Sequence, residues 1–169
     1  MAEEPLRVVV ERLQEICLQR GLSIATAESC TGGRIANLVT SVPGSSSYFH
    51  GGVVSYSDDA KRLLLDVEGE LLAAHGAVSA QVARAMAVGV RGRLGVDAAV
   101  SVTGVAGPGG GSAAKPVGLT YVAVADAAGV DVRRFAWSGD RAANIEASAR
   151  AAIELLLARI EASRPGSGE

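Results

Sequence analysis

The hydrophobic positions of the chain repeat with two periods, and the change from one to the other predicts its elements. Apolar residues spaced three and four positions apart indicate the buried side of a helix, and short apolar runs between turn residues indicate strands. The helical pattern occupies residues 6–17, 35–42, 60–65, 70–74, 82–94 and 145–160. The strand pattern occupies residues 22–27, 49–56, 97–102, 119–125 and 130–137. Helices and strands therefore alternate along most of the chain.

Residues that favour helix ends stand at the edges of these segments. Gly21 and Pro43 each follow a helical pattern, as expected where a helix ends. Ser57, Ser79 and Asp140 each precede one, and their side chains are good N-terminal caps. The predicted boundaries thus agree with the periodicity.

The order of the elements predicts a three-layer α/β/α domain around a mixed, mostly parallel sheet. The last two strands flank a turn at residues 126–129 and are expected to form an antiparallel hairpin. A length of 169 residues is typical of a single domain with a substantial core. We therefore expect one domain over residues 1–162 and a disordered tail over residues 163–169.

The charge balance excludes several classes of partner. Sixteen basic and 18 acidic residues, without a long run of either sign, give no surface typical of binding to nucleic acid or to an anionic membrane. No stretch of about 18 apolar residues occurs, and the first residues are charged, so we expect a soluble, cytoplasmic protein. A small neutral or zwitterionic molecule is the expected partner.

The cysteines and histidines predict neither a disulfide framework nor a metal site. Cys17 and Cys30 are too few for such a framework, and their spacing to His50 and His75 matches no zinc pattern. Both histidines are expected to be surface or packing residues rather than catalytic ones. Cys30 is an alternative nucleophile, although a small apolar residue in a first helical turn is more often buried.

The stretch TAESCTGG offers the first candidate site. Ser29 stands where a strand is predicted to pass into a helix near Cys30, at the sheet edge where α/β proteins bind ligands. Ser29 either caps this helix or acts as a nucleophile whose oxyanion is held by N–H groups of residues 30–33. Gly32 and Gly33 favour the nucleophile, because each glycine in a first helical turn costs about 1 kcal/mol and indicates close access to the backbone.

The stretch SYSDDAK, residues 55–61, contains a candidate base. Lys61 falls in the first turns of a helix, where the helix dipole and partial burial both disfavour the charged amine. Asp58 and Asp59 oppose this effect if they face the lysine, which would then be an ordinary solvated residue. Tyr56 either helps to move or orient a proton or packs in the core.

The segment SVTGVAGPGGGSAAKPVG, residues 101–118, is a glycine-rich loop after a strand. It does not match a phosphate-binding loop, because Lys115 is followed by a proline and a strand. It also lacks the third glycine of a dinucleotide fingerprint. Two interpretations remain: a solvated loop, or a wall whose N–H groups bind an anion, with Thr103 as a polar contact.

The stretch Gly139-Asp140-Arg141 places a guanidinium at the start of the last predicted helix. Arg141 is mildly unfavourable next to the positive end of the helix dipole, so it is expected to have a partner. This partner is either a carboxylate of the protein or a phosphate or carboxylate of a ligand.

Six motifs taken together resemble those of the CinA C-terminal domain family. They occur in order across nearly the whole chain, and although each alone is weak, the set is specific. The motifs are AESCTGG at 27–33, YSDDAK at 56–61, HGAVS at 75–79, TGVAGPGGG at 103–111, KPVG at 115–118 and GDR at 139–141.

The resemblance implies an activity and roles for particular residues. It implies a nicotinamide-nucleotide amidohydrolase that converts nicotinamide mononucleotide and water to nicotinate mononucleotide and ammonia. Carried over by position, Ser29 is the expected nucleophile and Lys61 its base, with Tyr56 assisting. The residues expected to bind substrate are Thr103, Arg141, Cys30, Thr31, Gly32, Gly33, Gly107, Gly109 and Gly110. No cofactor is implied.

The resemblance also implies a stand-alone domain with a five-stranded sheet, and a homodimer. A non-catalytic module that binds a pyridine nucleotide or a related metabolite is the alternative. One departure from the family pattern bears on phosphate binding. Relatives often carry a second basic residue a few positions after GDR, whereas Asn144, Ile145 and Glu146 stand here.

Overall fold

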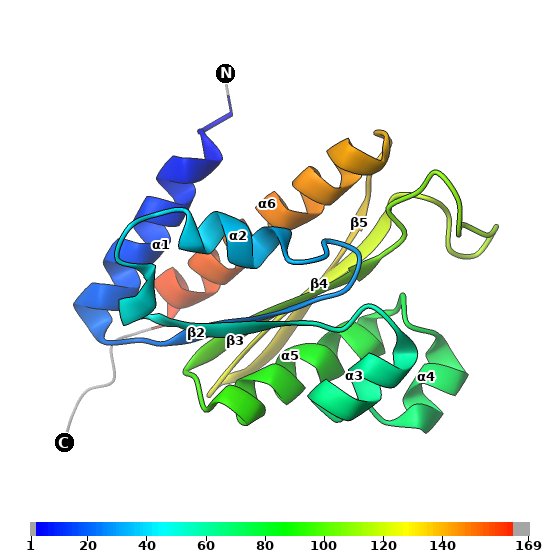
Figure 1. Cartoon of the computed structure of the whole chain (residues 1–169), viewed down its shortest axis with the longest axis horizontal. Coiled ribbons are helices and arrows are strands. Elements are labelled where there is room, and N and C mark those ends of the chain that lie inside the picture. Colours follow the sequence, from blue (N-terminus) through cyan, green and yellow to red (C-terminus); the bar gives the residue numbers. More distant parts are fainter. Residues whose placement is uncertain (1–2, 164–169) are drawn as a thin grey trace.

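A five-stranded sheet lies between two layers of helices in the computed structural model, which describes residues 3–163 (Figure 1). The strands are β1 (Ile24–Glu28), β2 (Phe49–Val54), β3 (Ala98–Gly104), β4 (Leu119–Asp126) and β5 (Gly129–Ala136). The helices are α1 (Leu6–Arg20), α2 (Arg34–Thr40), α3 (Asp58–Leu65), α4 (Gly69–His75), α5 (Ala80–Leu94) and α6 (Arg141–Ala162), with a 3-10 turn at Ser45–Ser47. None of these helices is long and apolar enough to cross a membrane.

The strand order is β2-β1-β3-β4-β5. β1 pairs in parallel with both β2 and β3, whereas β4 is antiparallel to its neighbours β3 and β5. β4 alone therefore runs against the other strands of the sheet. The prediction of a mixed, mostly parallel sheet of five strands in a three-layer domain is confirmed.

Each face of the sheet is covered by its own set of helices. Figure 1 shows α1, α2 and α6 on one face and α3, α4 and α5 on the other. The apolar stripes that predicted the helices face inward, with Leu13, Ile35 and Ile153 fully buried on the first face and Met86 on the second. α3 and α5 approach so closely that a Cβ atom on Gly89 would clash with a backbone carbonyl of α3.

The predicted N-terminal caps are confirmed. The hydroxyl of Ser57 accepts a hydrogen bond from Ala60 N at 3.1 Å, and that of Ser79 accepts one from Val82 N at 3.2 Å. The Asp140 carboxylate accepts one from the backbone N–H three residues later at 2.8 Å. These caps fix where α3, α5 and α6 begin.

Two element boundaries differ from the predictions where the site is built. The second strand ends at Val54, so the two residues after it lie in a loop. The helix predicted to start near Cys30 starts at Arg34 instead. Gly32 and Gly33 are the reason, because their φ angles of +58° and +104° are left-handed and cannot belong to an α-helix. They form a turn rather than a first helical turn.

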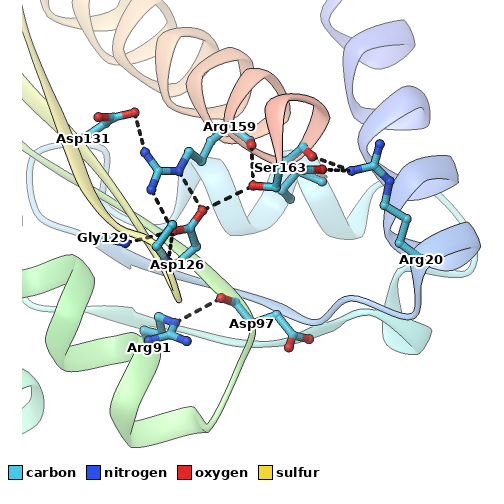
Figure 2. A network of polar contacts seen from close by, with 10 residues as sticks. Arg20, Arg91, Asp97, Asp126, Gly129, Asp131, Arg159 and Ser163 are labelled. Carbon is cyan, nitrogen blue, oxygen red and sulfur yellow. Dashed lines mark hydrogen bonds and ion pairs between the residues drawn. The ribbon is translucent and has the colours of Figure 1, made fainter. Parts of the chain in front are cut away.

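A polar network holds the C-terminal end of α6 against the β4–β5 hairpin (Figure 2). Arg159 donates to Asp126 at 2.6 and 2.7 Å and to Asp131 at 2.7 Å. Arg20 of α1 donates to the carbonyl of Ser163, the last described residue, at 2.8 Å. The rest of the predicted tail, residues 164–169, lies outside the described residues.

Candidate functional site

The site lies where the carboxyl ends of the parallel strands meet, at the right-hand end of the sheet in Figure 1. The register pairs Glu28 with Val54 of β2 and with Val102 of β3. The residues that follow these three in the chain, Ser29, Ser55 and Thr103, therefore stand at the same edge. This is the edge where ligands bind in α/β proteins.

Ser29 and Lys61, which are far apart in the sequence, are in direct contact. Lys61 Nζ lies 2.9 Å from Ser29 Oγ and 2.8 Å from the carbonyl oxygen of Ser55. Lys61 is 1% exposed and Ser29 is 8% exposed. The lysine is therefore not a solvated surface residue, and the serine hydroxyl is not a helix cap.

The surroundings of Lys61 favour its neutral form. Burial lowers the pKa of Lys61, because the ammonium loses its hydration, and the charge of Asp58 partly opposes this shift. Asp59 points elsewhere, since its side chain is 94% exposed and lies 3.6 Å from Arg62. Of the two aspartates that the sequence offered as opposing charges, one acts on the lysine.

Glu28 is a site residue that the sequence reasoning missed. Its side chain is fully buried, and Oε1 accepts hydrogen bonds from Thr31 Oγ1 at 2.7 Å and from Ile35 N at 2.8 Å. Oε2 accepts one from Ala36 N at 3.0 Å. Glu28 thus caps α2 and fixes the turn that follows Ser29. An acidic residue shortly before a helical pattern was the only local signal.

The turn after Ser29 contains two backbone donors that directly follow Ser29 in the chain. Among the described residues, the N–H groups of Cys30 and Thr31 have no hydrogen-bond acceptor on another residue. Gly32 N is used, since it donates to the Ser29 carbonyl at 3.1 Å. Burial raises the pKa of the Cys30 thiol to about 12, so this thiol stays protonated and is a poor nucleophile.

Ser29 and Lys61 open into a cavity of about 270 Å³. The cavity brings together most of the side chains and glycines that the sequence singled out. Its lining includes Ser29, Cys30, Tyr56, Lys61, Thr103, Gly107, Gly109, Gly110 and Arg141. It does not include Thr31, Gly32 or Gly33, and the Thr31 hydroxyl turns toward Glu28. His50 and His75 are exposed and lie outside it.

Arg141 and Tyr56 form one wall of the cavity. Arg141 Nη1 donates to the carbonyl of Gly107 at 2.8 Å, and Nη2 donates to Tyr56 Oη at 3.1 Å. Tyr56 is 60% exposed, so it is not a core residue. Within residues 3–163, no carboxylate lies within 4.0 Å of the Arg141 guanidinium. The hydrogen-bond acceptors of this guanidinium are therefore the neutral groups of Gly107 and Tyr56.

The segment between α4 and α5 also lines the cavity, through Ala77 and Val78, and three successive carbonyls there are held by side chains. Lys115 Nζ donates to the carbonyl of His75, and Ser79 Oγ donates to that of Gly76 at 2.8 Å. Thr103 Oγ1 donates to the carbonyl of Ala77, also at 2.8 Å. Lys115 and Thr103 thus support a wall of the cavity by holding its backbone.

Elsewhere among the described residues, two further hollows have no hydroxyl or thiol side chain in their lining, and no metal site is formed. A larger hollow of about 910 Å³ lies between α3, α4 and α5, but its lining contains no serine, threonine or cysteine. Among residues 3–163, no group of three or more His, Cys, Asp and Glu side chains is arranged to hold a metal ion. The serine–lysine pair is therefore the candidate reactive centre.

Comparison with known proteins gives a consistent match. The family model of the CinA C-terminal domain matches residues 6–160. A CinA-like protein of Chloroherpeton thalassium is 50% identical over 158 residues, which cover 90% of this chain and 37% of that protein. A CinA-like protein of a Geobacter species, strain M21, is 55% identical over 131 residues, which cover 78% of this chain and 32% of that protein. The chain thus spans about a third of the length of these relatives.

Solved structures resemble the whole domain. The competence/damage inducible protein CihA of Agrobacterium tumefaciens has a TM-score of 0.89 and 42% identity, covering 94% of this chain and 98% of that one. The competence damage-inducible protein A of Klebsiella pneumoniae has a TM-score of 0.92 and 30% identity, covering 95% of this chain and 100% of that one.

Proposed function

This chain belongs to the CinA C-terminal domain family, and from that premise we propose that it hydrolyses the carboxamide of nicotinamide mononucleotide. The products are nicotinate mononucleotide and ammonia. The observation that carries the proposal is the contact of 2.9 Å between the buried Lys61 Nζ and Ser29 Oγ. A serine hydroxyl needs an adjacent base to become a nucleophile, and a neutral amine at this distance is such a base.

The first half of the reaction forms an ester with the enzyme. A neutral Lys61 has two N–H bonds for the carbonyls of Ser55 at 2.8 Å and Tyr56 at 3.5 Å, and a lone pair for the Ser29 hydroxyl. As Ser29 Oγ attacks the amide carbon, its proton passes to Lys61 Nζ. The N–H group of Cys30, which lines the cavity, is the candidate donor to the resulting oxyanion.

The second half releases both products. The tetrahedral intermediate collapses when Lys61 gives its proton to the amide nitrogen, the C–N bond breaks and ammonia departs. Water then attacks the ester carbon and gives a proton to Lys61, which returns it to Ser29 Oγ as the C–O bond breaks. The carboxylic acid product ionises in solution, and the enzyme is restored without any metal or redox step.

Arg141 is proposed to bind the phosphate of the substrate. Its guanidinium lines the cavity and donates to neutral acceptors only, at 2.8 and 3.1 Å, so its charge is available to an anion. Gly109 and Gly110 also line the cavity, and their N–H groups are further candidate donors.

Replacement of the nucleophile tests the proposal. Ser29→Ala is expected to lower ammonia release from nicotinamide mononucleotide by at least about 10³-fold, because the acyl-enzyme cannot form. Ser47→Ala, an exposed serine outside the cavity, is the matched control and is expected to keep the wild-type rate. Ammonia is measured by a coupled assay, and folding by thermal unfolding.

Two results would contradict the proposal. If Ser29→Ala keeps wild-type turnover, Ser29 is not the nucleophile. If the wild-type protein is stabilised by the mononucleotide in thermal unfolding but releases no ammonia, the protein is a binding module rather than an amidohydrolase.

A further inference from the structure

A buried amide side chain connects the start of α6 to the glycine-rich loop. Asn144 is 2% exposed, and both ends of its amide are used. Nδ2 donates to the carbonyl of Ala106 at 3.0 Å, and Oδ1 accepts from Gly139 N at 3.0 Å. Asn144 does not line the cavity, but Ala106 does. It therefore acts on the site only through the backbone that it holds.

Asn144 and Arg141 hold two successive carbonyls of the loop. Asn144 binds the carbonyl of Ala106, and Arg141 Nη1 binds that of Gly107 at 2.8 Å. Gly107 has a φ of +87°, in a region that glycine enters freely, so its own backbone preference does not fix the direction of its carbonyl. The hydrogen bonds at the Ala106 and Gly107 carbonyls help to fix it.

We propose that Asn144 is a positioning residue that aims the Arg141 guanidinium at the anionic group of the substrate. This inference rests on the proposed function, in which the anionic group of the substrate is its phosphate. Arg141 has five N–H donors, and Gly107 and Tyr56 occupy one on each Nη atom. The remaining donors point to a fixed place only while the Gly107 carbonyl is fixed, and Asn144 provides that constraint.

Asn144 also belongs to a buried polar network, so loss of stability alone says nothing about positioning. Its carbonyl accepts from Ser148 Oγ at 2.7 Å, and Ser148 Oγ accepts from Trp137 Nε1 at 3.0 Å. The test must therefore compare two substrates with the same amide, of which one lacks the phosphate. Nicotinamide mononucleotide and nicotinamide riboside form such a pair.

Asn144→Asp is the informative change, because aspartate has the same shape and can still accept from Gly139 N but cannot donate to Ala106. We expect kcat/KM for the mononucleotide to fall about tenfold, mainly through KM, as for a misaligned hydrogen bond to a charged group. We expect kcat/KM for the riboside to change by less than about twofold. Equal losses with both substrates would overturn the inference.

A double-mutant cycle makes the test stricter. Arg141→Met removes the guanidinium, so in that background Asn144→Asp is expected to leave the ratio of the two kcat/KM values unchanged. A further tenfold loss for the mononucleotide in that background would show that Asn144 acts by another route. Asn144→Ser, whose hydroxyl is too short to bridge both partners, repeats the comparison if the aspartate variant does not fold. Failure of both variants to fold would assign Asn144 to fold stability and overturn its positioning role.

Failure of the proposed function gives a different result. If the wild-type protein releases no ammonia from either compound, the same proteins are titrated with both compounds by calorimetry. Asn144→Asp is then expected to weaken binding of the mononucleotide about tenfold and to leave riboside binding unchanged. A wild-type protein that binds neither compound would overturn the inference together with the function.

Discussion

At the scale of single residues, the decisive feature is an amine that has lost its water. Lys61 is 1% exposed, and its nearest oxygens are the Ser29 hydroxyl and the carbonyl of Ser55 rather than a carboxylate. Carbonyls accept N–H bonds from a neutral amine as well as from an ammonium, but unlike a carboxylate they carry no charge to neutralise the ammonium. The site thus holds the lysine in place and still disfavours its protonated form.

This environment predicts how turnover depends on pH. The ordinary pKa of lysine is about 10.4, burial lowers the pKa of Lys61, and the proposed mechanism uses the neutral form. The value of kcat/KM for ammonia release is therefore expected to rise with pH through an ionisation below the ordinary value and to be lost on the acid side. Lys61→Met is expected to lower kcat/KM about 10²–10⁴-fold and to abolish this ionisation.

The stability of the same variant serves as the control. Because the folded pKa of Lys61 is below the unfolded value, the unfolded chain binds more protons between the two values, and stability rises with pH there. Removal of the amine removes this penalty, so Lys61→Met is expected to unfold at the wild-type temperature or above it. A pH profile identical in wild type and Lys61→Met would contradict the role of the lysine.

At the scale of elements, the turn between β1 and α2 depends on an internal cap. Glu28 is the last residue of β1, and its buried side chain accepts hydrogen bonds from Thr31 Oγ1, Ile35 N and Ala36 N at 2.7–3.0 Å. Two of these donors are backbone N–H groups in the first turn of α2. The turn that begins at Ser29 is therefore held at its far end, the start of α2, by hydrogen bonds to Glu28, the residue before Ser29.

Glu28→Gln is expected to destabilise the protein by about 1–3 kcal/mol, because the amide must face one of these donors with its own N–H group. In a domain of this size, that corresponds to a fall of about 3–10 °C in Tm. Circular dichroism measures the change. Glu70→Gln is the matched control, since Glu70 is exposed in the first turn of α4 and is expected to change stability by less than about 0.5 kcal/mol. Equal effects of the two substitutions would contradict the internal cap.

The elements also show how far sequence patterns reach. Periodicity and caps predicted α3, α5 and α6 well, because apolar spacing and Ser or Asp caps are local properties. The start of α2 was predicted too early, because periodicity does not register two glycines with left-handed φ angles. Glu28 and Asn144 were not predicted as structural supports, because their hydrogen-bond partners are fixed by turns and loops that exist only in the folded chain.

At the scale of the whole molecule, one end of the sheet carries the candidate site and the other carries a polar network that joins α6 to the hairpin. The site is at the carboxyl end of β3, whereas Asp126 lies beside the start of β3 because β4 is antiparallel. There Asp126 accepts from Arg159 and from Ala128 N and Gly129 N, at 2.6–3.1 Å (Figure 2). The network joins α6 to the hairpin without touching the site.

This network predicts an acid-sensitive contribution to stability. The Arg159 guanidinium, together with the backbone donors, holds the pKa of Asp126 below its ordinary value. The contribution is therefore fully present above the unfolded pKa, about 3.9, and is lost as pH falls through the folded value. Asp126→Asn is expected to lower stability at pH 7 by about 1–3 kcal/mol.

The difference between wild type and Asp126→Asn is expected to shrink at acid pH, when thermal unfolding is compared at neutral pH and near pH 3. Asp59→Asn is the matched control, because its side chain is 94% exposed and its loss is expected to have little effect. Ammonia release at room temperature is expected to match wild type in both variants. A difference between wild type and Asp126→Asn that stays constant with pH would contradict the network's contribution.

At this largest scale, the fold class followed from the sequence, since the alternation of helices and strands and the final hairpin fix a mixed sheet. Periodicity predicted neither the strand order nor which strands pair with β1. Those depend on crossovers that bring Val54 and Val102 to opposite sides of Glu28. The family resemblance, not the pattern, suggested that Ser29 and Lys61 act together.

The two residues proposed to carry out the reaction come from a single early stretch of the chain. Ser29 and Lys61 both lie within residues 24–65, whereas the residues proposed to grip the phosphate begin with the loop after β3 and end with Arg141. Parallel pairing of β1 with β2 places the segments that carry the first two side by side. Under the proposed function, substitutions in the second half are therefore expected to change which amide is bound more than how its C–N bond is broken.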